Sequence, residues 1–445
     1  MKKTICLLIM SALLLPMQAQ SSHLDSIRMQ LSFLTQAHYD STLVLSLEEA
    51  CNYAVAQNRS LQNASLEVKK AHAQRWQTIA AMLPQADGSL AYSNMCGYEM
   101  NLNGMKIQMP DYNMYSVTVS AGLNGQAIVG ALLNNIAITM QNISLEQSED
   151  ELRANVINSY LSVLVTADVI QLLDSSLQNL RSLAMQTQRM VEVGAAESTE
   201  ADKLLVQVNT FANTVQSYRR NLQLSYSALR ALLNVSESTD LHLTTPLSDF
   251  VSTEYTMQLL MQEWDIHRNH NYRLLEQNVD LAKKNVIMAG MAYLPTVSAY
   301  YQYSYRQNFS EGGFNMTPPN MIGATVSMPL WSSGKRASAI TEKKIALQEA
   351  ENTFSETTDN LAVQYSQLRY NLANAFESYL TDKENVDVTK RVFNNTSNKY
   401  QWGAASALEL TNASSDLNNA ETTYVSSVMS MVNALVELEK FLNNN

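Results

Sequence analysis

The chain has 445 residues, of which 46% are hydrophobic and 16% are charged, so it can bury a core and is not intrinsically disordered. Its formal net charge of −11 argues against a nucleic-acid partner, since phosphate backbones are bound by proteins with an excess of Lys and Arg. Three cysteines are too few for a disulfide framework, and we therefore expect helix packing to stabilise the fold.

The first 19 residues have the three parts of a secretory signal peptide. Lys2 and Lys3 give a positive start, residues 5–17 are mostly apolar, and Ala19 completes an acceptable cleavage site. The apolar run is shorter than the roughly 18 to 20 residues that a membrane-spanning helix needs. No later run of that length is apolar throughout, so we expect any membrane crossing to be made by strands. Residues 20–45 are expected to form an N-terminal arm.

Residues 46–253 form the first of two predicted repeats. Ser46 and Glu49 have the spacing of a capping box, which predicts a helix from 46 to about 57, and a second helix is expected over about 60–82. The periodicity then changes from helical to alternating. This change predicts strands at about 85–95 and 113–123 with a loop between them, followed by a long helix over about 125–193 and a partner helix over about 198–233.

The same order of elements recurs in residues 254–445, the second predicted repeat, after a loop at 234–253. We expect helices over about 254–267 and 271–292, strands over about 296–307 and 320–331, a long helix over about 334–402 and a partner helix over about 406–442. Equivalent landmarks, such as Pro84 and Pro295 or Gly194 and Gly403, lie about 210 residues apart. Such a steady offset predicts an internal duplication.

The two long helices indicate an elongated helical assembly. Neither Gly nor Pro occurs between Gly130 and Gly194, or between Gly334 and Gly403. A helix over about 130–192 would be about 95 Å long at 1.5 Å per residue, far longer than the helices of compact domains. Apolar residues recur within it at a spacing of three and four, which predicts a long coiled bundle or tube. They include Leu152, Val156, Tyr160, Val163, Ala167 and Ile170.

Each predicted strand pair has one apolar and one polar row. Tyr115, Val117 and Val119 alternate with Ser and Thr, and the stretches 113–124 and 320–331 carry no charge. This pattern is typical of a barrel wall between lipid and water, although a soluble sandwich would show the same alternation. Four strands do not close a barrel, whereas three chains would supply about 12. We therefore predict an α+β membrane protein, a homotrimer with a long α-helical coiled-coil barrel and a 12-stranded transmembrane β-barrel.

Residues 45–58 resemble the opening helix of the TolC-like outer membrane efflux protein family, the outer membrane factors. The Leu-Pro step before each strand pair, the passage at 330–334 and the glycine at each helical turn are also similar. The resemblance covers essentially the whole mature chain. It implies a homotrimeric exit duct in outer membrane lipid whose helical portion lies in the periplasm, and whose partners are an inner-membrane transporter and a periplasmic adaptor protein.

The resemblance also implies where the gate and the adaptor-binding surface lie. Ala405 stands where the family pattern has an Arg, so a latch through that Arg is not expected. Glu409 is expected to be the carboxylate more available to ions and Tyr400 the steric element, while acids at helix starts that favour the helix dipole are the alternative. The expected periplasmic gate residues are Tyr400, Glu409, Glu200 and Asn412, and the expected adaptor-contacting turns are Val193, Gly194, Ala195, Gly403 and Ala404.

No catalytic, cofactor-binding or metal-binding constellation is apparent, so we do not expect an enzyme. The six histidines do not cluster, and His267 and His270 are expected to be solvated. A loop over 95–114 is rich in methionine, which keeps Cu(I) efflux open beside the plainer role of flexible apolar packing. An exit duct for type I polypeptide secretion stays open as an alternative function. The strand pattern argues against a periplasmic coiled-coil structural protein.

Overall fold

The computed structural model describes residues 42–102, 105–247, 250, 252–309 and 318–442. The predicted signal peptide and most of the predicted arm lie outside these residues. Two compact units are formed. Unit 1 comprises the described residues up to Arg59, together with Asn155–Val251 and Thr389–Glu421, and unit 2 comprises Ser60–Ala154, Ser252–Val388 and the residues from Thr422 onward. Each predicted repeat contributes to both units.

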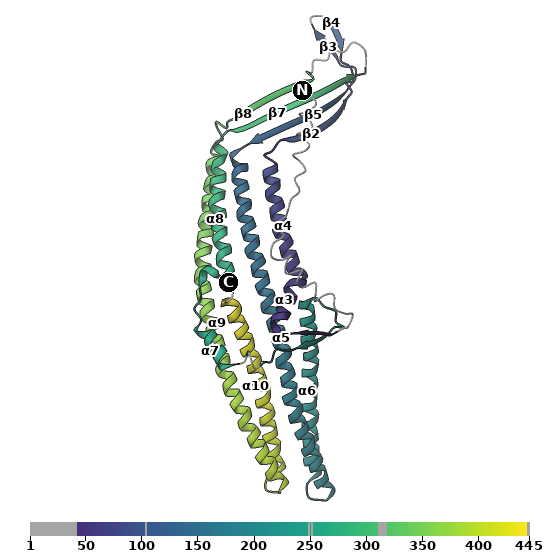
Figure 1. Cartoon of the computed structure of the whole chain (residues 1–445), viewed down its shortest axis with the longest axis vertical. Helices are drawn as coiled ribbons and strands as arrows, with labels where there is room; N and C mark the ends of the chain where they lie inside the picture. The colour runs from purple at the N-terminus through teal and green to yellow at the C-terminus, as the bar shows by residue number, and fades with distance from the viewer. Residues whose placement is uncertain (1–41, 103–104, 248–249, 251, 310–317, 443–445) are drawn as a thin grey trace. The chain divides into compact units, whose positions relative to one another are not determined.

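Unit 2 contains a four-stranded antiparallel sheet in the order β2-β5-β7-β8 (Figure 1). The central strands pair along their whole overlap, from Tyr112 opposite Asn308 to Leu123 opposite Val297. Strands from the two halves of the sequence therefore form the middle of one sheet. Within the described residues, β2 and β8 are edge strands. The bounds are β2 (Gln85–Ser93), β5 (Tyr112–Leu123), β7 (Thr296–Asn308) and β8 (Asn320–Ser327).

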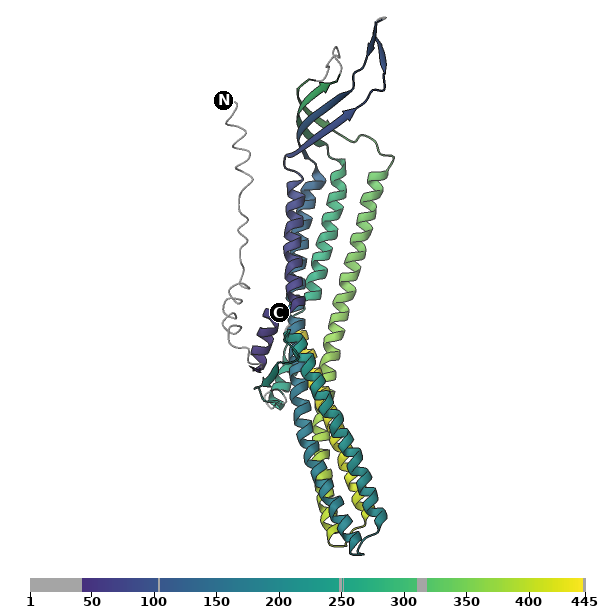
Figure 2. The ribbon, with the colours of Figure 1, turned by 90° about the vertical axis from the view of Figure 1, so that its right-hand side faces the viewer.

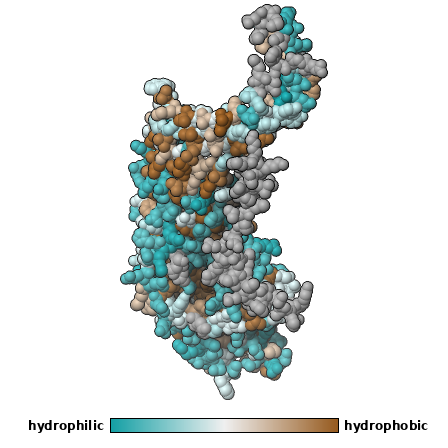
Figure 3. All heavy atoms as spheres, turned by 45° about the horizontal axis from the view of Figure 1, so that its top comes forward, coloured by the Kyte–Doolittle hydropathy of each residue, from teal (hydrophilic) through white to brown (hydrophobic). Residues whose placement is uncertain are grey.

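One face of this sheet is apolar and exposed. The register places Tyr115 opposite Tyr305 and Val117 opposite Tyr303, so that apolar side chains align across strands. The other face carries polar side chains, among them Ser89 and Ser116, whose hydroxyl oxygens are 2.6 Å apart. In Figure 3 the brown, apolar atoms are concentrated over the sheet. The exposed apolar side chains include Leu90, Tyr115, Val117, Val119, Val297, Tyr301, Tyr303, Tyr305, Ile322 and Val326.

Unit 1 contains the turns of two helical hairpins, and these turns lie at the same end of the unit (Figures 1 and 2), while α5, α9 and α10 each begin or end in unit 2. The first hairpin joins α5 (Gly125–Glu192) to α6 (Ser198–Leu233), and the second joins α9 (Lys335–Gln401) to α10 (Ala407–Leu442). The predicted apolar seam faces the core between these helices. The fully buried side chains of unit 1 include Tyr160, Leu161, Leu173, Leu204, Leu229 and Leu410.

The shorter helices begin with local capping contacts. Ser46 and Glu49 form the predicted capping box, in which the Ser46 N–H donates to Glu49 Oε2 at 2.8 Å, and this carboxyl's pKa is lowered chiefly by that bond. Asn269 caps α8 with its side-chain oxygen. The bounds are α3 (Leu47–Gln57), α4 (Arg59–Ala80), α7 (Thr253–Met261) and α8 (His270–Gly290), with 3₁₀ turns at Ile266–Arg268 and Met291–Tyr293.

Four segments differ from the expected elements. The end of the predicted arm forms β1 (Thr42–Leu45), which pairs in parallel with β6 (Asp240–Leu243) from the predicted loop 234–253. The Tyr160 hydroxyl fastens this pair to α5, since it donates to Leu45 O and accepts from Thr245 N–H, both at 3.1 Å. The predicted loop between the first two strands contains β3 (Glu99–Leu102) and β4 (Met105–Gln108). β8 ends at Ser327 rather than near 331, because Pro329 has no N–H for a ladder.

One of the described helices is apolar enough to cross a membrane by length and composition alone. It is α5, in which an 18-residue window has a mean hydropathy of 1.6 with 44% of the window buried. The core helix of a bundle passes the same test, and Val156, Tyr160 and Leu161 of α5 are fully buried within the protein. Helix packing therefore accounts for this window.

Candidate functional site

The two helical turns of unit 1 have the same backbone geometry. Gly194 and Gly403 adopt the left-handed conformation, with φ of +75° and +71°. The following residue in each turn donates its N–H five residues back, Ala195 to Met190 O at 2.7 Å and Ala404 to Lys399 O at 2.8 Å. These are Schellman motifs, in which glycine has no Cβ to strain at φ above zero. The predicted turn glycines therefore end α5 and α9 in equivalent ways.

Apolar side chains project into solvent at both turns. Val193 precedes Gly194 and is 79% exposed, and Trp402 holds the equivalent position before Gly403 and is 87% exposed. Leu408, in the first turn of α10, is also exposed. Trp402 and Leu408 were not predicted, although a tryptophan directly before a helix-ending glycine is a signal that the sequence offers. Exposed apolar groups on such tight turns are suited to contact another protein.

Tyr400 and Glu200 lie together where the two hairpins meet. Tyr400 is buried, and its hydroxyl donates to Glu200 Oε2 at 3.4 Å. Burial raises the pKa of the Tyr400 hydroxyl, hydrogen bonding with Thr187 lowers it, and the Glu200 carboxylate raises it again, so the hydroxyl stays a neutral donor. One residue further on, Gln401 Nε2 donates to Gln186 Oε1 at 3.1 Å. These bonds join the end of α9 to α5 and α6.

Glu409 forms the cap of α10. Its Oε2 accepts the Ser406 N–H at 2.8 Å, and its own N–H donates to Ser406 Oγ at 3.2 Å, which forms a capping box at the start of α10. Glu409 is exposed, whereas Glu200 is half-buried and accepts the Tyr400 hydroxyl, so the expectation that Glu409 is the more available carboxylate stays a prediction. Asn412 is exposed. Within the described part of the chain, neither Glu409 nor Asn412 is bonded to Tyr400 or Glu200.

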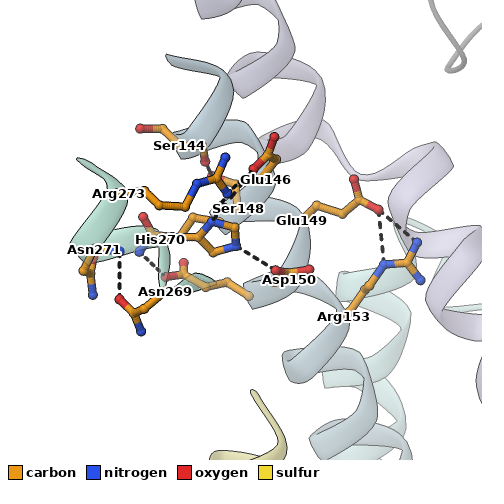
Figure 4. A network of polar contacts seen from close by, with 12 residues as sticks. Ser144, Glu146, Ser148, Glu149, Asp150, Arg153, Asn269, His270, Asn271 and Arg273 are labelled. Atoms are coloured by element: carbon orange, nitrogen blue, oxygen red, sulfur yellow. Dashed lines mark hydrogen bonds and ion pairs between the residues drawn. The ribbon is translucent and has the colours of Figure 1, made fainter. Parts of the chain in front are cut away.

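A second polar cluster lies in unit 2, where α8 begins beside α5 (Figure 4). His270 is 1% exposed, and its Nε2 is 2.8 Å from Asp150 Oδ2. Arg273 Nη1 donates to Glu146 Oε2 at 2.7 Å in the same cluster. The expectation that His270 is solvated is therefore wrong, because Asp150 supplies a partner that a buried imidazole needs. The cluster ties α8 to α5 and is structural.

Two features of the described residues bear on metal ligation. Among the described residues, no group of three or more His, Cys, Asp or Glu side chains is arranged to hold a metal ion. In the methionine-rich stretch, Cys96 is exposed and has a free thiol, and Met95 N–H donates to Asp111 Oδ1 at 2.7 Å. The stretch folds into the β3–β4 hairpin, in which Met100 pairs with Ile107 and Leu102 with Met105.

Comparisons with known proteins decide the family. Residues 51–235 and 266–444 match the sequence profile of the family described as outer membrane efflux protein. The chain belongs to the outer membrane efflux protein family. This confirms the resemblance seen at residues 45–58. The match leaves out residues 236–265, which contain α7 and the boundary between the two predicted repeats.

Relatives of this efflux protein are distant in sequence and similar in fold. The cation efflux system protein CusC of Escherichia coli (strain K12) is 22% identical over 391 residues, covering 82% of this chain and 79% of CusC. The crystal structure of CusC has a TM-score of 0.73 at 17% identity, covering 89% of this chain and 91% of that one. The CmeC outer membrane channel of Campylobacter jejuni has a TM-score of 0.71 at 15% identity, covering 89% and 85%. The protein is an outer membrane efflux channel with a mixed helical and sheet fold.

Proposed function

We propose that this efflux protein is the homotrimeric exit duct of a tripartite system, passing substrates from an inner-membrane transporter and a periplasmic adaptor to the exterior. The observation that carries the proposal is the exposed apolar face of the four-stranded sheet in unit 2. Exposure of a continuous row of Tyr, Val and Ile side chains to water costs free energy, whereas contact with lipid does not. The opposite row of Ser, Thr and Gln suits a water-filled interior.

The open edges of the sheet support a trimer. Strands β2 and β8 each have one unpaired edge within the described residues. Unpaired N–H and C=O groups are too costly in lipid, so the sheet needs partners for both edges. Pairing of β8 with β2 of the next chain around a three-fold axis satisfies both edges with one repeated contact. Three chains of four strands make a closed barrel of about 12 strands, an even number as in bacterial barrels.

We assign the helical part to the periplasm and the gate to its turns. Tyr400 and Glu200 link the two hairpins of one chain, and Glu409 and Asn412 lie on the nearby start of α10. The adaptor-contacting surface comprises Val193, Gly194, Ala195, Gly403 and Ala404, to which we add the exposed Trp402 and Leu408. Apolar side chains on a rigid turn lose little freedom when a partner covers them, which suits a docking surface.

Light scattering on detergent-extracted protein tests the assembly, and planar bilayer recording of the same sample tests conduction. Three chains per particle with ion conduction would support the proposal. A monodisperse monomer that still conducts ions would contradict the trimer. A stable trimer that never conducts, even when its gate is weakened by substitution, would contradict the duct.

A further inference from the structure

Glu421 is a buried carboxyl group that joins the two helical hairpins at a distance from their turns. It lies on α10, is 1% exposed, and its Oε1 accepts a hydrogen bond from Ser176 Oγ of α5 at 2.6 Å. Apolar side chains surround the pair, among them Phe211 of α6 and Phe393 of α9. All four long helices therefore meet at this carboxyl, which follows the turn glycine Gly403 by 18 residues.

A small cavity adjoins the carboxyl. Its volume is about 20 Å³, enough for one water molecule, and Asn179, Ser414 and Asn418 supply its polar lining. Glu421 Oε2 has no hydrogen-bond partner among the described residues. A carboxylate buried with one hydrogen bond is costly, since charge in a protein interior needs several bonds or a close ion pair. Burial of the neutral acid in the same place costs much less free energy.

Burial has a larger effect on the pKa of Glu421 than the charges around it. Burial raises the pKa of Glu421, while the Ser176 hydrogen bond and the field of Lys390 on α9 lower it to a lesser extent. No other titratable side chain lines the cavity from α5, α6, α9 or α10. Two residues before Ser176, Asp174 of α5 is already paired with Arg219 of α6 at 2.7 Å on the exposed side.

We propose that Glu421 is a proton-dependent latch between the two hairpins. In its neutral form it stays in the apolar core and holds α10 against α5 through Ser176. Ionisation draws water into the adjoining cavity and favours separation of the hairpins. Separation opens the duct if the proposed function holds, since Tyr400, Glu409 and Asn412 of the assigned gate flank the α9–α10 turn.

The sign of the pH dependence follows from the direction of the pKa. A carboxyl whose pKa is raised in the packed state binds its proton more tightly there than when the hairpins separate. The packed state is therefore fully stabilised below the ordinary Glu range and loses that stability as pH rises through the raised pKa. Between those two values, the ratio of separated to packed hairpins should rise about tenfold per pH unit.

Hydrogen–deuterium exchange of the full-length protein tests the latch without requiring conduction. Peptides that contain Ser176 and Glu421 are compared with those of Glu421→Gln at each pH, so that the intrinsic pH dependence of exchange cancels. The glutamine keeps an oxygen for the Ser176 hydroxyl and does not titrate. We expect exchange in the wild type to exceed that of the variant increasingly as pH rises. Glu437→Gln, an exposed acid on the same helix, is the matched control and should follow the wild type.

A second variant tests the latch if Glu421→Gln fails to fold. Lys390→Gln removes the cation that lowers the pKa of Glu421. The rise of exchange with pH should therefore occur at higher pH in this variant than in the wild type. A flat ratio between wild type and Glu421→Gln, or an unmoved profile in Lys390→Gln, would overturn the latch. Bilayer recording separates the two proposals. A protein that shows the exchange difference but never conducts would contradict the duct and leave the latch standing.

Discussion

Replacement of Tyr400 by phenylalanine would isolate one bond between the hairpins. The ring is buried and its packing is unchanged by the substitution, so only the hydroxyl is lost, which donates to Glu200 Oε2 at 3.4 Å and also hydrogen-bonds with Thr187. Glu200 is half-buried, so water can replace the lost donor. The cost should therefore be at least the net value of one hydrogen bond, about 1 kcal/mol per chain, since the hydroxyl of the fully buried Thr187 loses the same partner.

In a trimer whose three chains open together, three such bonds amount to about 3 kcal/mol, or roughly a 100-fold shift toward the open state. Open probability of purified Tyr400→Phe in planar bilayers measures this shift. Tyr370→Phe, which removes the same hydroxyl from a tyrosine that is 71% exposed, is the matched control. An open probability of Tyr400→Phe equal to that of the control would refute a gating role for the Tyr400–Glu200 bond.

Three further predictions test other parts of the molecule. Gly323→Val should reduce the free energy of unfolding by about 1 to 3 kcal/mol and so lower the melting temperature, because a Cβ at this position would lie 2.6 Å from the Tyr300 ring. An unchanged melting temperature would contradict this packing. The double variant Glu200→Gln, Glu409→Gln should reduce cation selectivity and weaken block by multivalent cations, since a narrow ring of carboxylates attracts cations; unchanged selectivity and block would leave both acids as elements of their helix starts. A peptide tag at residue 315, outside the described residues, should be reached by antibody on intact cells, whereas labelling of a tag at Gly194 as well would contradict the proposed orientation.

Local features of this protein were determined by the sequence alone. Glycine at positions 194 and 403 marks two helix ends because an αL residue is strained for any side chain with a Cβ. The capping box at Ser46 and Glu49 involves residues only three apart. Alternation along 113–123 and 296–307 predicted two-faced strands because successive side chains of a strand point to opposite sides. In each case the physical cause acts within a few residues, so a short stretch of sequence carries it.

Contacts between distant segments were decided only by the tertiary structure. β1 and β6 are short and weakly patterned, and they become strands because each supplies the other's hydrogen bonds across about 200 residues of sequence. His270 is buried because Asp150 lies opposite it on α5. Glu421 is hydrogen-bonded to Ser176, which is 245 residues away in the sequence. The sequence around a single polar residue in a helix does not show which residue of another helix will contact it, because the apolar periodicity of the helix is the same with or without that partner. Burial and pairing of such groups depend on the assembled helices, which is why the turns were predictable and the bonds that join the hairpins were not.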